Sequence, residues 1–204
     1  MNFLAHLHLS GDNSAVMTGN FLGDFIRMKE LTLSEDNVQN RNIIKGMRLH
    51  KCIDLYTDSH PLVKQVQKIF IPKFGKYASV LSDLYFDYLL CNHWQLFSSI
   101  SLKEFSNSAY ENLDVNRKFF NGHASRFYGY MYANNLLVNY GSLEGMKMVL
   151  NGISNRRVSS NINLALSIEV FQEHESAIRD YFIKFYPDLL GRGKEFLEHT
   201  DLVY

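Results

Sequence analysis

The chain has 204 residues, 46% hydrophobic and 14% aromatic, a composition that excludes intrinsic disorder and suits one well-buried core. Lysine plus arginine equals aspartate plus glutamate at 21 each, so no global field favours nucleic acid or a membrane surface, and we expect neither as a partner. The opening residues lack a basic segment before their apolar run, and no uninterrupted apolar stretch is long enough for a membrane span, so we expect neither a signal peptide nor such a span.

The opening segment, MNFLAHLHLSGDNSAVMTGNFLGDF, combines an apolar run with two histidines, His6 and His8, and an aspartate, Asp24. A chain terminus is usually loose and tolerant of change. This one is apolar enough that we expect it to pack into the core and to contribute polar side chains to the wall of a site. A helix is expected over about 14–28, and its cap is one of four polar residues: Ser10, Asp12, Asn13 or Ser14.

Apolar residues recur every three or four positions along the rest of the chain, which predicts helices. The expected helices cover about 36–57, 59–72, 77–97, 122–139, 142–153, 160–186 and 188–199, and another begins at Ser101 in a capping box with Glu104. Pro72 and Gly75 are expected to close the second of these, and Asn121-Gly122 and Asn151-Gly152 to end helices. No pair of alternating runs joined by a hairpin turn predicts a sheet. The prediction is a single compact multi-helix, all-α domain over 1–204.

Two cysteines, Cys52 and Cys91, fall in these periodic segments without metal-binding or redox spacing. Such residues are typical of reduced, packed thiols. We therefore expect a cytoplasmic protein.

The stretch GMRLHKCIDLYTDSHP, residues 46–61, places His50, Asp54 and Asp58 four residues apart. Residues at this spacing lie one turn apart on the same face of a helix. A second helix repeats the spacing with Asp83 and Asp87. His93 follows at the end of that helix.

Carboxylates that lie among bulky apolar residues are costly to bury unless they are paired, hydrogen-bonded or bound to metal. Several converging carboxylates repel one another, and a divalent cation is the simplest group that holds them together. Histidine plus carboxylate without thiolate suits Mn²⁺, Fe²⁺, Mg²⁺ or Zn²⁺. In the alternative interpretation, Asp54 and Asp58 are caps or surface acids paired with Arg48 or Lys51. His6 and His8 are then hydrogen-bonded core residues.

Between residues 41 and 76 the sequence holds eight basic residues and two acids, an excess of six positive charges in a neutral protein. A positive surface beside a metal site suits an anionic partner or a phosphate-bearing substrate. Arg156 and Arg157 offer planar forks that bind phosphate, or they cap the end of a helix. A solvated helix face is the alternative for the basic segment.

Five segments together resemble the acyl carrier protein phosphodiesterase family, also called acyl carrier protein hydrolases. They are MNFLAHLHL at the start, GNFLGDF at 19–25, the pattern at 46–61, DLYFDYLLCNHW at 83–94 and LNGISNRR at 150–157. The resemblance implies hydrolysis of the phosphodiester that joins 4′-phosphopantetheine to a serine of holo acyl carrier protein. It also implies an all-helical fold similar to HD-domain phosphohydrolases, and Mn²⁺ as the cofactor, with Mg²⁺ or Fe²⁺ as alternatives.

The resemblance also implies roles for residues at the motif positions. The implied metal ligands are His6, Asp24, His50, Asp54 and Asp83. The implied catalytic residues are Asp58, Asp87 and His93. Arg48, Lys51, Arg156 and Arg157 are the expected substrate-binding residues, and holo acyl carrier protein, an acidic protein, is the expected partner. The opening motif also contains His8, to which it assigns no clear role.

Three other functions stay open at the level of sequence. The first is an HD-like metal-dependent phosphohydrolase that acts on another small phosphodiester or a nucleotide. The second is a carrier-binding module without catalysis, which the intact acids disfavour. The third is a helical di-iron oxidase, which the absence of a Glu-x-x-His motif disfavours.

Overall fold

The computed structural model describes residues 1–27, 33–34, 37–157 and 162–199. These residues form helices and no strand, which confirms the all-α prediction. The helices are α1 (Phe3–His8), α2 (Ser14–Leu22), α3 (Val38–Ser59), α4 (Pro61–Phe74), α5 (Ala78–Asn92), α6 (Leu102–Asp114), α7 (Gly122–Ala133), α8 (Leu136–Asn139), α9 (Leu143–Arg157) and α10 (Ser167–His199). Short 3-10 turns are η2 (Gly75–Tyr77), η3 (Trp94–Leu96), η4 (Arg117–Phe119) and η5 (Leu164–Leu166). Within the described ranges, no helix is both long and apolar enough to cross a membrane.

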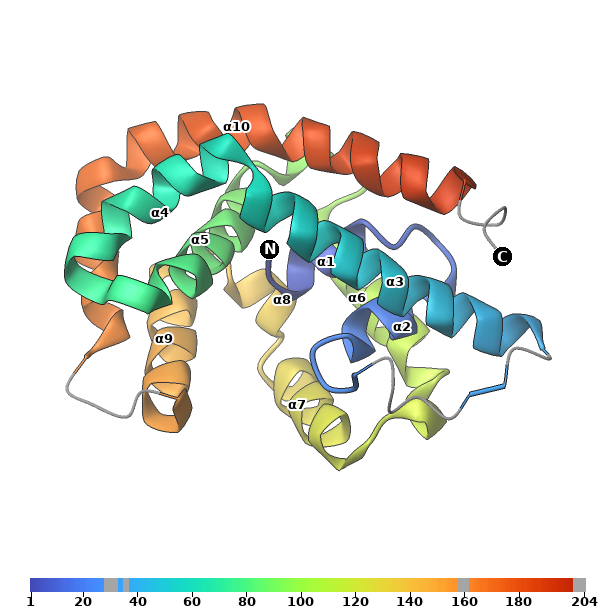
Figure 1. The fold of residues 1–204 in the computed structure, drawn as a ribbon. Coiled ribbons are helices and arrows are strands. Elements are labelled where there is room, and N and C mark those ends of the chain that lie inside the picture. Colours follow the sequence, from blue (N-terminus) through green and yellow to red (C-terminus); the bar gives the residue numbers. More distant parts are fainter. Residues whose placement is uncertain (28–32, 35–36, 158–161, 200–204) are drawn as a thin grey trace.

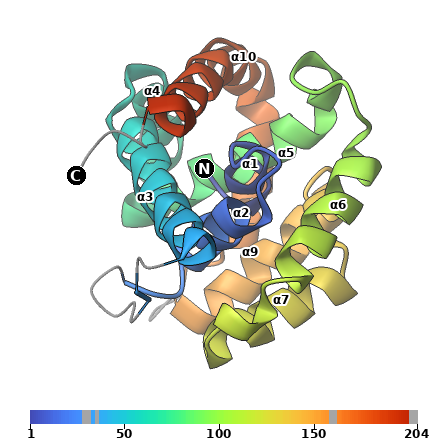
Figure 2. The same ribbon diagram turned by 90° about the vertical axis from the view of Figure 1, so that its right-hand side faces the viewer.

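The long helix α10 lies along one side of the molecule, and α3, α4 and α5 pack against it (Figure 1). Helices α7 and α9 lie on the opposite side (Figure 1). The short α1 lies between α3 and α6 (Figure 2) and contacts α2 and α5. The first helix of the chain is therefore surrounded by helices from much later in the sequence.

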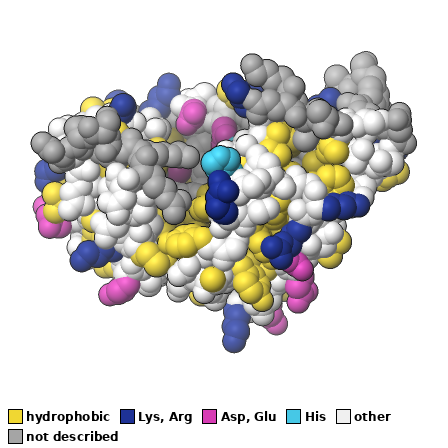
Figure 3. All heavy atoms as spheres, turned by 90° about the horizontal axis from the view of Figure 1, so that it is seen from below, with side chains coloured by type: hydrophobic (Ala, Val, Ile, Leu, Met, Phe, Trp, Pro, Cys, Tyr) yellow, Lys and Arg dark blue, Asp and Glu magenta, His cyan; other side chains and the backbone are white. Residues whose placement is uncertain are grey.

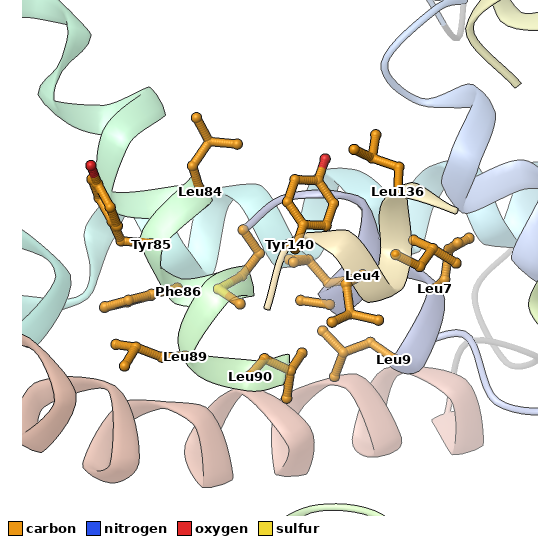
Figure 4. Close-up of a cluster of buried hydrophobic side chains, with 14 of the residues drawn as sticks. Leu4, Leu7, Leu9, Leu84, Tyr85, Phe86, Leu89, Leu90, Leu136 and Tyr140 are labelled. Atoms are coloured by element: carbon orange, nitrogen blue, oxygen red, sulfur yellow. The ribbon is translucent and has the colours of Figure 1, made fainter. Parts of the chain in front are cut away.

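The core explains why the opening segment is fixed in place. Leu4 and Leu7 of α1 are fully buried, in a cluster with Leu84 and Phe86 of α5 and with Tyr140, which follows α8 (Figure 4). Burying one such side chain contributes about 1.5–3 kcal/mol relative to exposure. The terminal segment is thus part of the core, as its apolar composition predicts.

Several predicted helix ends agree with the structure. Asn13 caps α2, because its side chain accepts hydrogen bonds from the amides of Ala15 and Val16. Ser101 and Glu104 form the expected capping box at the start of α6. Gly75 ends α4 with a φ of 53°, a backbone conformation that favours glycine.

Other predicted helix ends are wrong. Asn121 begins a helix rather than ending one, because its side chain accepts a hydrogen bond from the amide of Ala124. Asn151-Gly152 lies inside α9, whose Leu150 is fully buried, so packing outweighs the cost of a helical glycine, about 1 kcal/mol.

Two prolines also lie inside helices. Pro72 is in the last turn of α4, and Pro187 is in the middle of α10, where we expected a break. Pro187 is exposed, whereas Tyr186 and Leu189 beside it are fully buried. The packing of these two side chains holds one continuous helix. The helix expected over 122–139 is instead interrupted by Asn135, which has a φ of 42°.

Helices α2 and α3 touch backbone to backbone at two glycines. A Cβ atom added to Gly19 would collide with the carbonyl oxygen of Ile43. One added to Gly46 would collide with the carbonyl oxygen of Val16. The pair therefore allows an approach that no larger residue permits, and it brings the polar residues of α2 next to those of α3.

Candidate functional site

Three of the predicted site residues come together where α1 meets α3. Asp54 lies between two histidines: its Oδ1 is 3.2 Å from His6 Nε2 and its Oδ2 is 3.1 Å from His50 Nε2. The two imidazole rings stack with their centroids 4.3 Å apart. One ligand atom from each of the three side chains lies within 4.8 Å of the others, so we call them the His-His-Asp group.

Local structure explains how α3 presents its two members. His50 and Asp54 are one helical turn apart, so their side chains point the same way. Gly23, which follows α2, leaves room for the His50 ring, since a Cβ atom at that position would collide with it. Gly23, the second glycine of the GNFLGDF segment, thus lets the His50 ring pack against the end of α2.

The electrostatics of the group favour a negative carboxylate. Burial opposes ionisation of Asp54, but the hydrogen bond to His50 helps to hold the pKa of Asp54 well below its usual range. Burial and the neighbouring His50 lower the pKa of His6. Burial alone would lower the pKa of His50, but the hydrogen bond to Asp54 and the charge of Asp24 raise it above its usual value.

The donor set fits a divalent cation. Two imidazole nitrogens and one carboxylate are ligands that transition metals such as Mn²⁺, Fe²⁺ and Zn²⁺ accept. Three protein ligands leave coordination positions for water or substrate, as catalytic sites require. The Asp54 side chain is 44% exposed, so the group is accessible from solvent.

The structure does not bring the other two predicted ligands into the His-His-Asp group. Asp24 is exposed just beyond α2, where its charge acts on His50. Asp83 accepts a hydrogen bond from the amino group of Met1 at 2.9 Å. Burial raises the pKa of Asp83 to about 6, although the Met1 ammonium opposes the shift. Both acids border the group without touching it.

The three predicted catalytic residues lie in different surroundings. Asp58 is exposed one turn beyond Asp54 on α3. Asp87 is fully buried and accepts hydrogen bonds from the backbone amides of Asn2, at 3.2 Å, and Leu4, at 2.8 Å. His93 follows the last residue of α5, roughly 15 Å along the helix from Asp83. Among the described residues, the His-His-Asp group includes none of these three predicted catalytic residues.

Asp87 anchors the start of α1, and its replacement should show this. Asp87→Ala leaves two amides without their acceptor and is expected to lower the free energy of unfolding by roughly 2–4 kcal/mol. Asp87→Asn keeps an acceptor oxygen for one of the two amides and places its NH₂ group against the other, so it should lose less than Asp87→Ala, about 1–2 kcal/mol. Urea unfolding followed by circular dichroism measures both, with Asp180→Ala on the exposed face of α10 as the control. Equal losses in the two Asp87 variants would refute the anchoring role.

His8, which also belongs to the opening motif, points away from the group. Its Nδ1 is 2.8 Å from the hydroxyl of Tyr186, and its ring contacts Trp94. Burial lowers its pKa to about 4. It is therefore a packed neutral histidine between α1 and α10.

Among the predicted substrate-binding residues, Arg48 and Lys51 are exposed on α3. Arg156 and Arg157 end α9, and their side chains lie outside the described part of the structure. Figure 3, which views the side of the molecule that carries α7 and α9, shows acidic side chains in a recess with a histidine and a basic side chain at its edge. This face offers space for a ligand.

Sequence reasoning missed two residues that shape the site, Asn20 and Gly23. Asn20 is fully buried on α2 and contacts the His6 ring, and Gly23 makes room for His50. Both lie in GNFLGDF, where the signal in the sequence was an asparagine between two glycines, Gly19 and Gly23, in an apolar run. That spacing indicates close helix packing around a polar side chain.

Comparison with known proteins adds the family. The family model described as acyl carrier protein phosphodiesterase matches residues 1–189. Proteins named acyl carrier protein phosphodiesterase are similar along nearly their whole length. The relative from Yersinia pestis is 29% identical over 198 residues, 95% of this chain and 98% of its own. Those from Enterobacter sp. and Escherichia coli O6:H1 are each 30% identical over 200 residues, 95% of this chain and 98% and 97% of their own.

No solved structure matches the chain significantly. The resemblance predicted from five short segments is therefore confirmed by matches that extend over the chain as a whole. Those segments include all three members of the His-His-Asp group. The chain belongs to the acyl carrier protein phosphodiesterase family.

Proposed function

We propose that this protein is a metal-dependent phosphodiesterase that hydrolyses the phosphodiester between 4′-phosphopantetheine and a serine of holo acyl carrier protein, yielding the apo carrier. The observation that carries the proposal is an accessible His-His-Asp group in a chain whose relatives are named acyl carrier protein phosphodiesterases. A phosphodiester is anionic and resists attack by water. Its hydrolysis is therefore helped by a Lewis acid, such as the divalent cation that a His-His-Asp group could hold. The proposed location is the cytoplasm, in keeping with two free cysteines.

In this proposal, His6, His50 and Asp54 hold one divalent cation, and Mn²⁺ is the proposed ion, with Mg²⁺ or Fe²⁺ as alternatives. A bound cation would neutralise charge on the phosphoryl oxygens and make an attacking water more acidic. Asp24 and Asp83 are the proposed additional ligands, since the charge of Asp24 reaches His50 and that of Asp54 reaches Asp83.

Other side chains are proposed to handle water and protons. Asp58, exposed one turn beyond Asp54, orients the attacking water. Asp83, whose pKa burial raises to about 6, would release its proton on binding the cation. Asp87 acts by anchoring α1, which carries His6. His93, at the far end of α5, takes no part in this proposal.

The carrier is proposed to bind along basic side chains near the site. Lys51 is exposed on α3, three residues before Asp54, and Arg48 is exposed one turn earlier. Helix α4 and η2 continue this basic surface without any acid; their exposed lysines are Lys64, Lys68, Lys73 and Lys76. Arg156 and Arg157 are proposed to bind phosphate from the end of α9. A row of positive charge steers an acidic protein toward the site.

Charge reversal at Lys51 tests this surface. Lys51→Glu is expected to raise the KM for holo carrier several-fold at low salt and to leave kcat nearly unchanged. Charged residues at the rim of an interface affect mainly the rate at which the partners associate. The increase should shrink as ionic strength rises. Steady-state kinetics at two salt concentrations measures both effects, and Lys103→Glu on α6 is the matched control. An unchanged KM in Lys51→Glu would contradict carrier docking at this surface.

Intact mass spectrometry tests the activity itself. Purified protein is incubated with Mn²⁺ and holo carrier, and the carrier mass is compared before and after. The proposal predicts conversion to apo carrier with release of phosphopantetheine. Unchanged carrier with each of several divalent metals would refute it. Turnover of small phosphodiesters or nucleotides without turnover of carrier would favour the alternative phosphohydrolase.

A further inference from the structure

We propose that Asn20 is a positioning residue that fixes the tautomer and ring orientation of His6, so that His6 Nε2 presents its lone pair toward Asp54. The inference deepens the proposed function, because it concerns the residues that would hold the cation. It rests on a buried hydrogen-bond network between α1 and α2, which involves Asn20, His6 and Ser10.

The network fixes which way the Asn20 amide points. Asn20 is fully buried, and its Nδ2 donates to the backbone carbonyl of His6 at 2.7 Å and to Ser10 Oγ at 2.9 Å. The Ser10 hydroxyl itself donates to the same His6 carbonyl at 2.8 Å, so its oxygen accepts from Asn20. A carbonyl only accepts, so both contacts require the NH₂ group of the amide on this side.

The opposite end of the amide then determines the His6 tautomer. Asn20 Oδ1 is 2.8 Å from His6 Nδ1, and a carbonyl-type oxygen has no hydrogen to donate. Nδ1 must therefore carry the ring hydrogen. In a neutral imidazole only one nitrogen is protonated, so Nε2 keeps its lone pair.

With Nδ1 protonated, His6 Nε2 and Asp54 Oδ1 are both hydrogen-bond acceptors, and they lie next to each other. The lone pair of His6 Nε2 and the carboxylate oxygen Oδ1 of Asp54 are 3.2 Å apart. Two acceptors at this distance are favourable when a cation lies between them. Ligating histidines are commonly oriented by a hydrogen bond at their second ring nitrogen, and loss of that partner typically costs 10–100-fold in metal affinity.

Asn20 lies on α2, where this helix contacts both α1 and α3. Its neighbour Gly19 is in backbone contact with Ile43 of α3, which also carries His50. Asn20 in turn holds α1 through the carbonyl and ring of His6. One buried amide therefore sets the position of His6 relative to the helix that supplies the other two members of the group.

Nitrogen-15 NMR of the metal-free wild-type protein tests the tautomer directly, without any assay of activity. The proposal predicts that neutral His6 is protonated at Nδ1 and unprotonated at Nε2. Protonation at Nε2 instead would overturn the proposal, whatever the outcome of the carrier assay. The reverse also holds: failure of the carrier assay leaves this measurement intact.

Variants test the effect on metal. Asn20→Asp keeps the acceptor toward Nδ1 but loses the donor toward the His6 carbonyl, so by calorimetry it should bind Mn²⁺ more weakly than wild type and more tightly than Asn20→Leu. Asn20→Leu removes the acceptor and should weaken Mn²⁺ binding about 10–100-fold. Thr18→Val is the matched control, because Thr18 is fully buried on the same helix and its hydroxyl has no partner among the described residues. Wild-type affinity in a folded Asn20→Leu, or equal losses in the Asp and Leu variants, would overturn the proposal.

Discussion

Asp54→Asn is expected to weaken Mn²⁺ binding and to lower kcat/KM for holo carrier by at least about 100-fold each, because even the outer partners of metal ligands contribute 10–100-fold. The substitution keeps the size of the side chain and removes its charge. The carboxylate oxygens that carry this charge lie 3.2 Å from His6 Nε2 and 3.1 Å from His50 Nε2. Calorimetry with Mn²⁺ and steady-state turnover of holo carrier measure the two effects.

Asp188→Asn is the matched control for this prediction. Asp188 is also a carboxylate beside a histidine, 3.9 Å from His60, but its side chain is 60% exposed and lies on α10. It should retain both Mn²⁺ affinity and turnover. If Asp54→Asn kept wild-type affinity for the metal, the His-His-Asp group would not be the metal site. If it kept turnover as well, the site of reaction would lie elsewhere.

The second large effect is expected at the contact between α2 and α3. Gly46→Ala adds a methyl group that meets the backbone carbonyl of Val16, which has no rotamer with which to move aside. We expect a loss of about 3 kcal/mol, at the upper end of ordinary overpacking. In a protein of this size that corresponds to a fall in Tm of roughly 6–12 °C, measured by calorimetry.

Gly191→Ala is the control for a helical glycine without a neighbour. A Cβ atom at Gly191 in α10 has nothing within 4 Å. Gly191→Ala should raise the free energy of unfolding slightly, by up to about 1 kcal/mol, because alanine has a higher helix propensity than glycine. Equal behaviour of Gly46→Ala and Gly191→Ala would show that α2 and α3 are not in backbone contact.

Several parts of this structure that depend on local sequence were predictable, although Asn121 was assigned to the wrong end of a helix. The spacing of His50 and Asp54 puts them on one helix face whatever the rest of the fold does. Capping residues such as Asn13 and Ser101 act within a few residues of their own position. Helix continuity was less predictable, since Pro187 lies in a helix that its buried neighbours hold together.

The parts that depend on long-range packing were not predictable from spacing. His6 reaches α3 because Gly19 and Gly46 bring two helices into backbone contact. Asp83 and Asp87 share the spacing of His50 and Asp54, yet one pairs with the Met1 amino group and the other anchors α1. A carboxylate that binds metal and one that holds a buried amide look alike in a sequence, because both lie among apolar residues.

The claim on which the account depends is that His6, His50 and Asp54 hold one divalent cation. Anomalous diffraction from crystals grown with Mn²⁺, collected above the manganese absorption edge, tests it most directly. The account predicts one strong peak about 2 Å from His6 Nε2, His50 Nε2 and a carboxylate oxygen of Asp54. A fully occupied peak away from these atoms, or no peak at saturating Mn²⁺, would contradict it.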